Sequence, residues 1–211
     1  MKVIGLTGGI SAGVTLVAAM FRDLGAVVVE ADQVSREVAH PGSEVVAKIK
    51  EAFGHHLVAP DGTLDRRRLG EIIFRDPEAR ARLNAITHPA IRRRIWEHLE
   101  AIHREQPEAV VIVDIPLLLD TSGPETFDLD GVIVVTATPE QQIQRTMSRD
   151  GLDRGEAQRR LDAQRPVALK AADADWVIDN AGSIEETRAQ VRAAWDDLRR
   201  SSGYRTPPRR P

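Results

Sequence analysis

The amino-acid sequence predicts an α/β protein in which helices cover both faces of a parallel five-stranded sheet. Five short apolar runs recur along the 211 residues, and helical patterns separate most of them. The runs are continuous and rich in β-branched residues, which is typical of parallel strands buried on both faces. The expected strands are residues 2–7, 26–30, 109–115, 131–136 and 175–179.

Composition excludes several classes of protein. Hydrophobic residues make up 42% of the chain and charged residues 29%, as in ordinary soluble globular domains, and the net charge of −3 offers no pull toward nucleic acid or membrane. The chain has no cysteine, no apolar run of membrane-spanning length and no signal-peptide profile at its start. We therefore expect a cytoplasmic monomer or small homo-oligomer that binds neither nucleic acid nor membrane.

A glycine-rich turn follows the first expected strand. Residues 5–16 read GLTGGISAGVTL, the outline of a phosphate-binding loop GxxxxGK[ST] in which Val14 stands at the lysine position. Such a loop aims backbone N–H groups and a helix N-terminus at an anion, and Val14 removes a cation but leaves those groups intact. Thr15 stands where a hydroxyl normally binds Mg²⁺. The alternative is a tight turn that needs glycine only for its geometry.

The helix after this turn is expected to bury one apolar stripe and to stop at Gly25. The expected stripe is Leu16, Val17, Met20, Phe21 and Leu24.

The second expected strand is followed directly by acidic residues. Asp32 stands at the carboxyl edge of the sheet, where open α/β folds bind ligands, and it could take a proton from an attacking hydroxyl. Glu30 lies two residues before it. In the alternative interpretation, Asp32 only caps a helix that starts at Gln33.

Nearly eighty residues separate the second and third strands, far more than one crossover helix requires. Helical patterns cover residues 43–54, 65–74 and 88–104 around a turn at 60–62, which predicts a helical lobe. The histidines of this region show no metal-like spacing. We therefore assign none of them to catalysis.

The second half of the chain offers a carboxylate and a basic segment. Asp114, inside the third strand, could steady a metal-bound water or be structural. Residues 141–170 are rich in arginine, and Arg145 and Arg149 share a helix face by their i, i+4 spacing. With Gly151 as a hinge, this segment could be a phosphate-binding lid or simply a solvated face. Capping signals predict helix starts after Thr138 and Ser183.

Taken in order, these segments resemble the dephospho-CoA kinases, P-loop enzymes that carry out the last step of coenzyme A synthesis. IGLTGGI and FRDLGAVVVEADQVSREV resemble the opening of that family. Its later landmarks are matched, in order and at similar spacing, by GTLDRRRLGEIIF, LNAITHPAIRRRI, IPLLLD, QRTMSRDGL and ADWVIDNAGS. The resemblance covers about residues 1–200.

The resemblance implies transfer of the γ-phosphoryl group of ATP to the ribose 3′-hydroxyl of dephospho-CoA, with Mg²⁺. It also implies a P-loop kinase-like α/β fold with a helical substrate-binding insertion and a short lid. The implied single domain has a core of about residues 1–40, 107–140 and 170–200, a CoA-binding insertion at about 41–106, a lid at about 141–169 and a flexible tail at 201–211.

The resemblance also implies roles for individual residues. Asp32 matches the second acid of the family's DAD motif and would be the base, with Glu30 in place of the first acid. Arg145 would neutralise charge from the lid, and Thr15 and Asp114 would bind the metal. The implied nucleotide-binding residues are Thr7, Gly8, Gly9, Ile10, Ser11, Ala12, Gly13, Val14, Thr15, Leu16, Arg149, Asn180 and Gly182. The implied acceptor-binding residues are Asp32, His88, Pro116 and Leu117.

The sequence departs from the family within the loop itself. The family pattern GGIGSGKST becomes GGISAGVTL, so Ser11 replaces a glycine and strains the loop if that position needs a positive φ. Val14 leaves a charge deficit, for which Lys170 or a lid arginine could substitute. The sequence therefore allows a compensated enzyme, a nucleotide- or CoA-binding relative with little turnover, or another small-molecule kinase.

Overall fold

The computed structural model describes residues 1–122 and 127–200. By internal contacts it divides into two compact units. Among the described residues, the first unit joins Met1–Glu30 to residues 99–122 and 127–200, and the second is Ala31–His98. The predicted tail at 201–211 lies outside the described residues.

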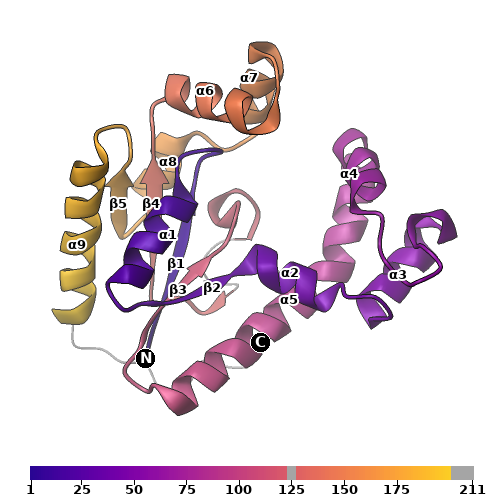
Figure 1. Ribbon diagram of the computed structural model, residues 1–211, viewed down its shortest axis with the longest axis horizontal. Helices are drawn as coiled ribbons and strands as arrows, with labels where there is room; N and C mark the ends of the chain where they lie inside the picture. The colour runs from indigo at the N-terminus through magenta and orange to yellow at the C-terminus, as the bar shows by residue number, and fades with distance from the viewer. Residues whose placement is uncertain (123–126, 201–211) are drawn as a thin grey trace. The chain divides into compact units, whose positions relative to one another are not determined.

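A five-stranded sheet forms the centre of the first unit (Figure 1). All its neighbouring strands are parallel, and the order is β2–β3–β1–β4–β5. The strands are β1 (Lys2–Gly8), β2 (Val27–Glu30), β3 (Val110–Asp114), β4 (Gly131–Thr136) and β5 (Trp176–Asp179). The five predicted strands are thereby confirmed. Because β1 lies between β3 and β4, the loop after it leaves from the middle of the sheet's carboxyl edge, where α/β folds bind ligands.

Two helices, α1 (Val14–Asp23) and α9 (Ile184–Arg200), pack together and share one core with the sheet. In α1 the buried residues are Val17, Ala18, Met20 and Phe21. The predicted stripe is wrong at Leu16, whose surface is 39% exposed. The reason is the helical period: the stripe centres on Val17 and Phe21, and a neighbour one position away points about 100° aside.

Glycines and polar caps end the helices of this unit as the sequence predicts. Gly25 follows α1 with φ +103°, in the left-handed region that glycine favours. Thr138 and Gln141 form a capping box at the start of α6 (Pro139–Asp150), and Ser183 and Glu186 do the same for α9. These local signals are confirmed because they depend on neighbours in sequence.

Helix α6 is followed by α7 (Arg154–Asp162) and α8 (Val167–Ala172). Gly151 ends α6 with φ +67°. In Figure 1, α6 and α7 lie beyond the arrowhead of β4, at the carboxyl edge of the sheet, and α8 contacts β4. A π-helical turn, η2 (Leu118–Ser122), follows β3.

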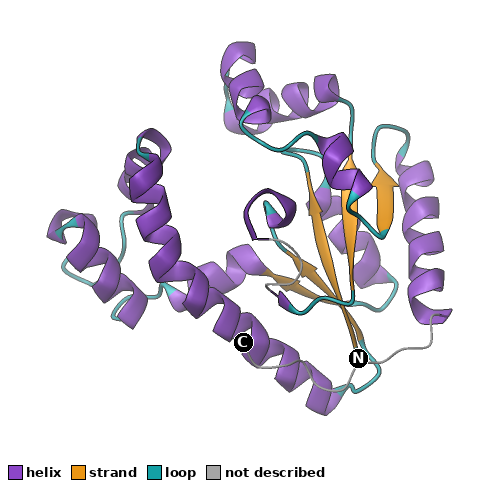
Figure 2. Cartoon of the chain, turned by 180° about the vertical axis from the view of Figure 1, so that it is seen from behind, coloured by secondary structure: helices purple, strands orange, loops and turns teal. Residues whose placement is uncertain are grey.

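The second unit consists mainly of helices and loops (Figure 2). Its elements are α2 (Ala31–Val38), α3 (Glu44–Phe53), a 3₁₀ turn η1 (His55–Leu57), α4 (Arg66–Arg75) and α5 (Pro77–Glu105), whose last residues from Leu99 belong to the first unit. Its core gathers buried aliphatic side chains, among them Ile49, Leu57 and Leu69. No helix in the described ranges is long and apolar enough to cross a membrane.

Helix α5 starts eleven residues earlier than the sequence predicts. The expected start at His88 places Pro89 in the first turn of the helix, a position that proline favours. Pro89 instead lies inside α5, where it lacks the N–H that would bond to the turn before. Leu83 and Ile86, in the turn before, pack against the core of this unit. Tertiary packing therefore holds a helix that local propensity would interrupt.

Candidate active site

The turn between β1 and α1 forms the start of the candidate site. Its backbone closes through the N–H of Ala12, which donates to the carbonyl of Gly9 (3.0 Å). Gly13 precedes α1 with φ +102°, and no side chain caps the helix. The first N–H groups of α1 therefore have no intrahelical acceptor, and the helix dipole favours negative charge at the same place. This is the geometry of an anion site.

Steric contacts explain two of the loop glycines. A Cβ built at Gly9 would collide with the Gln142 side-chain amide, and one at Gly13 with the Asn180 side-chain amide. Close packing therefore accounts for these two glycines, and no side chain caps the amides at the start of α1.

Helix α6 holds the loop through three side chains spaced i, i+3 and i+4. Gln142 Nε2 donates to the carbonyl of Ile10 (2.8 Å), and Thr146 Oγ1 donates to Ser11 Oγ (2.9 Å). Arg145 lies between them in sequence and donates to the carbonyl of Ala12 (3.5 Å). Gln142 and Thr146 are buried. Arg145, which the resemblance assigns to neutralising charge from the lid, thus contacts the loop directly.

Asn180, just after β5, braces the loop from a second element. Its Nδ2 donates to the carbonyl of Ala12 (2.7 Å), and its Oδ1 accepts from Thr187 Oγ1 (3.1 Å). Arg145 also donates to the backbone carbonyl of Asn180 (3.2 Å). The buried Asn180 side chain is thus engaged within the protein, whereas Gly182 is exposed.

Ser11 adopts φ +52°, in the left-handed region that non-glycine residues rarely occupy. The sequence predicts strain if this position needs a positive φ, and the structure confirms that it does. The hydrogen bond from Thr146 compensates part of the cost by giving the Ser11 hydroxyl a buried partner.

Val14 and Lys170 both approach Gly8, the first residue of the loop. A methyl carbon of Val14, Cγ2, lies 2.8 Å from the position of a Cβ built on Gly8. Lys170, on α8, is fully buried, and its Nζ lies 3.4 Å from the carbonyl oxygen of Gly8 and 2.6 Å from Asp120 Oδ2. An ammonium group therefore contacts the loop that lacks its own lysine.

Three oxygen-bearing residues lie at the carboxyl ends of β1 and β3 or just beyond them. Thr7 Oγ1 is buried and has no hydrogen-bond partner within residues 1–122 and 127–200. Thr15 is exposed in the first turn of α1, and Asp114 is the last residue of β3, opposite Leu6 in register. Nowhere in these two ranges do three or more His, Cys, Asp or Glu residues form a group that could hold a metal on its own.

Most basic residues of α6 to α8 form surface ion pairs instead of contacting the loop. Arg149 is exposed and bonds to its neighbour Asp150 (2.7 Å). The other pairs are Arg154–Glu140, Arg159–Glu156, Arg160–Asp150, Arg160–Glu156 and Arg165–Asp173. The predicted solvated face therefore describes these side chains, whereas Arg145 and Lys170 point inward.

Asp32 lies in the first turn of α2, two residues past the end of β2, and is exposed. The interpretation of Asp32 as a helix cap is wrong, because α2 begins at Ala31 and not at Gln33. Glu30, the last residue of β2, forms an ion pair with Arg22 on α1 (2.9 Å). Asp32 therefore has no capping role that would explain it.

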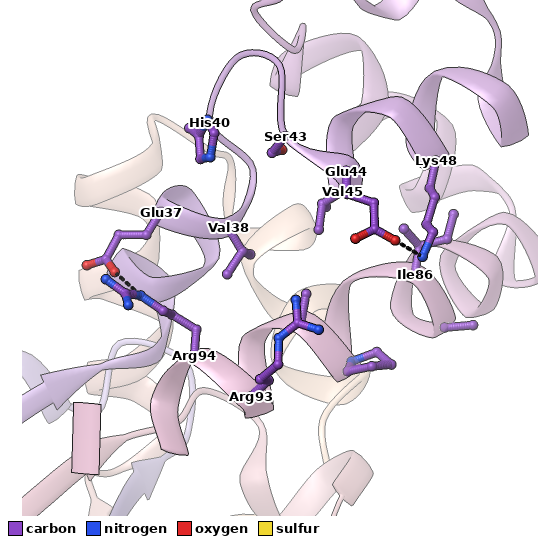
Figure 3. Close-up of a pocket in the computed structure, with 13 residues that line it drawn as sticks. Glu37, Val38, His40, Ser43, Glu44, Val45, Lys48, Ile86, Arg93 and Arg94 are labelled. Atoms are coloured by element: carbon purple, nitrogen blue, oxygen red, sulfur yellow. Dashed lines mark hydrogen bonds and ion pairs between the residues drawn. The ribbon is translucent and has the colours of Figure 1, made fainter. Parts of the chain in front are cut away.

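The second unit contains a cavity of about 720 Å³ (Figure 3). Val38, Val45 and Ile86 contribute apolar surface, and Arg93 extends toward the middle of the space. The Arg93 guanidinium forms no ion pair within the described part of the chain, in contrast to Lys48, which pairs with Glu44 (2.7 Å).

A charged cluster borders this cavity. Glu37 Oε2 accepts from Arg94 Nε (3.1 Å) and lies 3.0 Å from His98 Nε2. The hydrogen bond with His98, together with that from Arg94, holds the pKa of the Glu37 carboxyl below its ordinary value, although partial burial opposes this.

The remaining predicted acceptor-binding residues fall in both units. His88 lines a smaller cavity of about 240 Å³ in the second unit, where burial, aided by Arg92, lowers its pKa. Pro116 and Leu117 follow β3 in the first unit and are exposed, and Leu117 has φ +60°. A positive φ at a leucine is uncommon and costs conformational energy.

Sequence reasoning missed Gln142, Thr146 and Asp120. A signal for the first two is present in the sequence, since residues 142, 145, 146 and 149 form one helical stripe, of which only the arginines indicate a phosphate contact. Asp120 had no such signal, because its pairing with Lys170 joins residues fifty apart.

Comparison with known proteins gives the family of the chain. The family model described as dephospho-CoA kinase matches residues 2–186. The chain belongs to the dephospho-CoA kinase family. It is 44% identical to the dephospho-CoA kinase of Leifsonia xyli subsp. xyli over 94% of this chain and 100% of that protein. It is 46% identical to that of Moorella thermoacetica over 95% of this chain and 93% of the relative.

A solved structure supports the same family assignment. The dephospho-CoA kinase from Campylobacter jejuni superposes with a TM-score of 0.70 at 28% identity, covering 94% of this chain and 98% of that one. The expected P-loop kinase-like sheet is thereby confirmed. This chain is a dephospho-CoA kinase family member whose loop carries Val14 and Ser11.

Proposed function

We propose that this protein transfers the γ-phosphoryl group of ATP to the ribose 3′-hydroxyl of dephospho-CoA, which yields coenzyme A and ADP. Family membership supports this reaction. The observation that carries the proposal is the uncapped start of α1, whose backbone N–H groups suit a polyphosphate even though Val14 replaces lysine.

In this reaction the bond between the γ-phosphorus and the β,γ-bridging oxygen of ATP breaks, and a bond from the 3′-oxygen to phosphorus forms. The work of the protein is mainly positioning and charge neutralisation. The loop from Gly8 to Leu16, preceded by Thr7, would surround the phosphates, and Arg145 would neutralise charge that develops on them. The contact between Arg145 and the loop supports this role. Arg149 would approach only after leaving Asp150.

Asp32 would accept the proton of the attacking 3′-hydroxyl. Its exposure, its place just after β2 and the absence of a capping role support this assignment. General base catalysis typically contributes about 10²- to 10⁴-fold in rate. Glu30 has a different role, because it pairs with Arg22.

Mg²⁺ would accompany ATP, where it supplies charge neutralisation for the β- and γ-phosphates. Thr15 and Asp114 present hydroxyl and carboxylate oxygens, the donor type that Mg²⁺ prefers. Among the described residues no larger acidic cluster exists, and this fits a cation that takes one or two protein ligands and fills its shell with water and phosphate.

His88, which lines the smaller cavity of the helical unit, would contact the acceptor, and Pro116 and Leu117 of the first unit are proposed to do so as well. The cavity of Figure 3 would hold part of the acceptor: its apolar surface suits an aliphatic chain, and Arg93, which forms no ion pair among the described residues, suits an anionic group. Dephospho-CoA offers both, a pantetheine arm and a pyrophosphate. Residues 141–169 would serve as the lid, and the reaction would take place in the cytoplasm.

The test is an ADP-release assay with dephospho-CoA, run beside a calorimetric titration with an unhydrolysable ATP analogue and Mg²⁺. Acceptor-dependent ADP release supports the proposal. Binding of the analogue without turnover would identify a nucleotide-binding relative, and turnover on a nucleoside monophosphate but not on dephospho-CoA would refute the acceptor.

A further inference from the structure

We infer that Lys170 supplies the phosphate loop with the cation that Val14 lacks, and that Asp120 holds its ammonium in place. The inference concerns a residue for the reaction proposed above and in part rests on that function. It starts from the charge deficit: the side chain at position 14 normally reaches the β- and γ-phosphates as an ammonium. A valine there can provide neither the charge nor the donor.

Few cations are available to replace it. Within residues 1–122 and 127–200, the structure shows two cationic side chains that hydrogen-bond to the loop, Arg145 at the carbonyl of Ala12 and Lys170 at that of Gly8. The arginines at 149, 154, 160 and 165 are engaged by carboxylates. Lys170 is one of only four lysines in the chain.

Positions 14 and 170 meet at the same residue. The Val14 side chain packs against Gly8, and the Lys170 ammonium lies 3.4 Å from the carbonyl oxygen of Gly8. A cation brought in from α8 thus reaches the residue that the side chain at position 14 also faces. The sequence names Lys170 and the lid arginines as possible substitutes, and the contact with Gly8 favours Lys170.

The burial of Lys170 argues for a role beyond stability. Its side chain is fully buried, and its partner Asp120 is only 9% exposed. Burying such a pair removes both charges from water, and apolar replacement of buried pairs is often neutral or stabilising. A lysine in this place therefore suggests that its charge is used.

Asp120 is built to position this ammonium. Its Oδ2 lies 2.6 Å from Lys170 Nζ, while its Oδ1 accepts from the backbone N–H of Arg165 (2.8 Å). When polyphosphate enters the loop, the ammonium would be shared between Asp120 and a phosphate oxygen. Lys170 is then a phosphate-binding residue, and Asp120 is a positioning residue.

The experiment compares Lys170→Met with the wild type and with Lys2→Met as the matched control. Lys2 is also buried and donates to the carbonyl of Leu198, but it lies at the opposite end of β1, about 20 Å from the loop by strand geometry. Each variant is titrated with an unhydrolysable ATP analogue and Mg²⁺, and assayed for acceptor-dependent ADP release. If Lys170→Met alone does not fold, Lys170→Met combined with Asp120→Asn keeps the core neutral and takes its place.

The inference expects Lys170→Met to lower the affinity for the ATP analogue at least tenfold, or to lower turnover by about 10²- to 10³-fold as removal of one preorganised transition-state donor does. Lys2→Met should leave both unchanged per folded molecule. Adding Val14→Lys to Lys170→Met should restore the lost affinity or turnover, because it returns a cation to the loop. Val14→Lys alone should change little.

Three results would overturn the inference. These are wild-type affinity and turnover in Lys170→Met, a loss of turnover that Val14→Lys does not rescue, and a gain above tenfold from Val14→Lys alone. Should the wild type fail to phosphorylate dephospho-CoA, the proposed function fails by itself. The affinity for the ATP analogue then decides the role of Lys170, and an unchanged affinity overturns it.

Discussion

Replacing Thr146 with valine would remove the hydroxyl that bonds to Ser11, the strained residue of the phosphate loop. The two hydroxyl oxygens lie 2.9 Å apart, Thr146 is fully buried, and Ser11 has φ +52°. Residue 11 thus combines an unfavourable backbone conformation with a stabilising side-chain contact. A double-mutant cycle separates the two.

The magnitudes follow from these contacts. A side-chain hydrogen bond contributes about 1 kcal/mol net, and a buried hydroxyl left without a partner costs roughly 1–3 kcal/mol. Thr146→Val should therefore destabilise the protein by about 1–2 kcal/mol. Ser11→Gly loses the same bond and orphans the Thr146 hydroxyl, but relieves about 1 kcal/mol of left-handed strain. Ser11→Gly should therefore lower the free energy of unfolding by less than Thr146→Val does.

The double variant Thr146→Val, Ser11→Gly has neither of the two hydroxyls and no left-handed strain at residue 11. Its unfolding free energy should therefore be close to that of the wild type. The coupling between the two sites should be about 1–2 kcal/mol, within the range observed for residues in contact. Urea unfolding followed by tryptophan fluorescence measures it, and Thr146→Ser, which keeps the hydroxyl, is the control. For a domain of this size, 1 kcal/mol also shifts the midpoint temperature by about 2–4 °C.

The same substitutions should also change the affinity of the loop for nucleotide. Thr146→Val frees Ser11 to leave its observed conformation, so affinity for an ATP analogue should fall, and Ser11→Gly in the same chain should recover part of it. Effects that add to within about 0.5 kcal/mol would refute the reasoning, because they would mean that the two hydroxyls do not stabilise each other.

Three further predictions test other parts of the molecule. Asp32→Asn should lower acceptor-dependent turnover by about 10²- to 10⁴-fold and leave the calorimetric affinity for an ATP analogue unchanged; a turnover near wild type would remove Asp32 as the base. Asn180→Ala leaves the carbonyl of Ala12 with one donor fewer and should destabilise the protein by about 1–3 kcal/mol in urea unfolding, whereas an equal stability would mean that the brace contributes nothing. The pKa of Glu37 is held below its ordinary value of 4.5, so its contribution is present above that pH and is lost as pH falls through the lower folded pKa. Glu37→Gln should therefore be less stable than the wild type at pH 7 and match it in strong acid, and a difference that grows on acidification would contradict the assignment.

The parts of the fold that the sequence predicted are those that depend on neighbouring residues. The five strands, the stop at Gly25 and the capping boxes at Thr138 and Ser183 follow from local hydrophobic runs and side chains that satisfy nearby backbone groups. The predictions for Leu16 and the start of α5 were wrong for different reasons. Leu16 points away from the buried face of α1, whereas α5 begins early because packing in the core of the second unit outweighs local preference.

The candidate site likewise has features that local sequence predicted and features that it did not. The order of residues alone indicated the loop, the missing lysine at Val14, the doubtful Ser11 and the arginine at 145. The roles of Asp32, His88, Pro116 and Leu117 stay predictions until they are assayed.

The sequence by itself determined that a glycine-rich turn follows a buried strand and that this turn lacks its cation, because both are properties of adjacent residues. Only the tertiary structure decided which distant side chains contact this turn. Gln142, Thr146, Asn180 and Lys170 lie more than 120 residues from the loop they hold. The folded sheet brings them to its carboxyl edge, where hydrogen bonds and charge act over a few ångströms irrespective of separation along the chain.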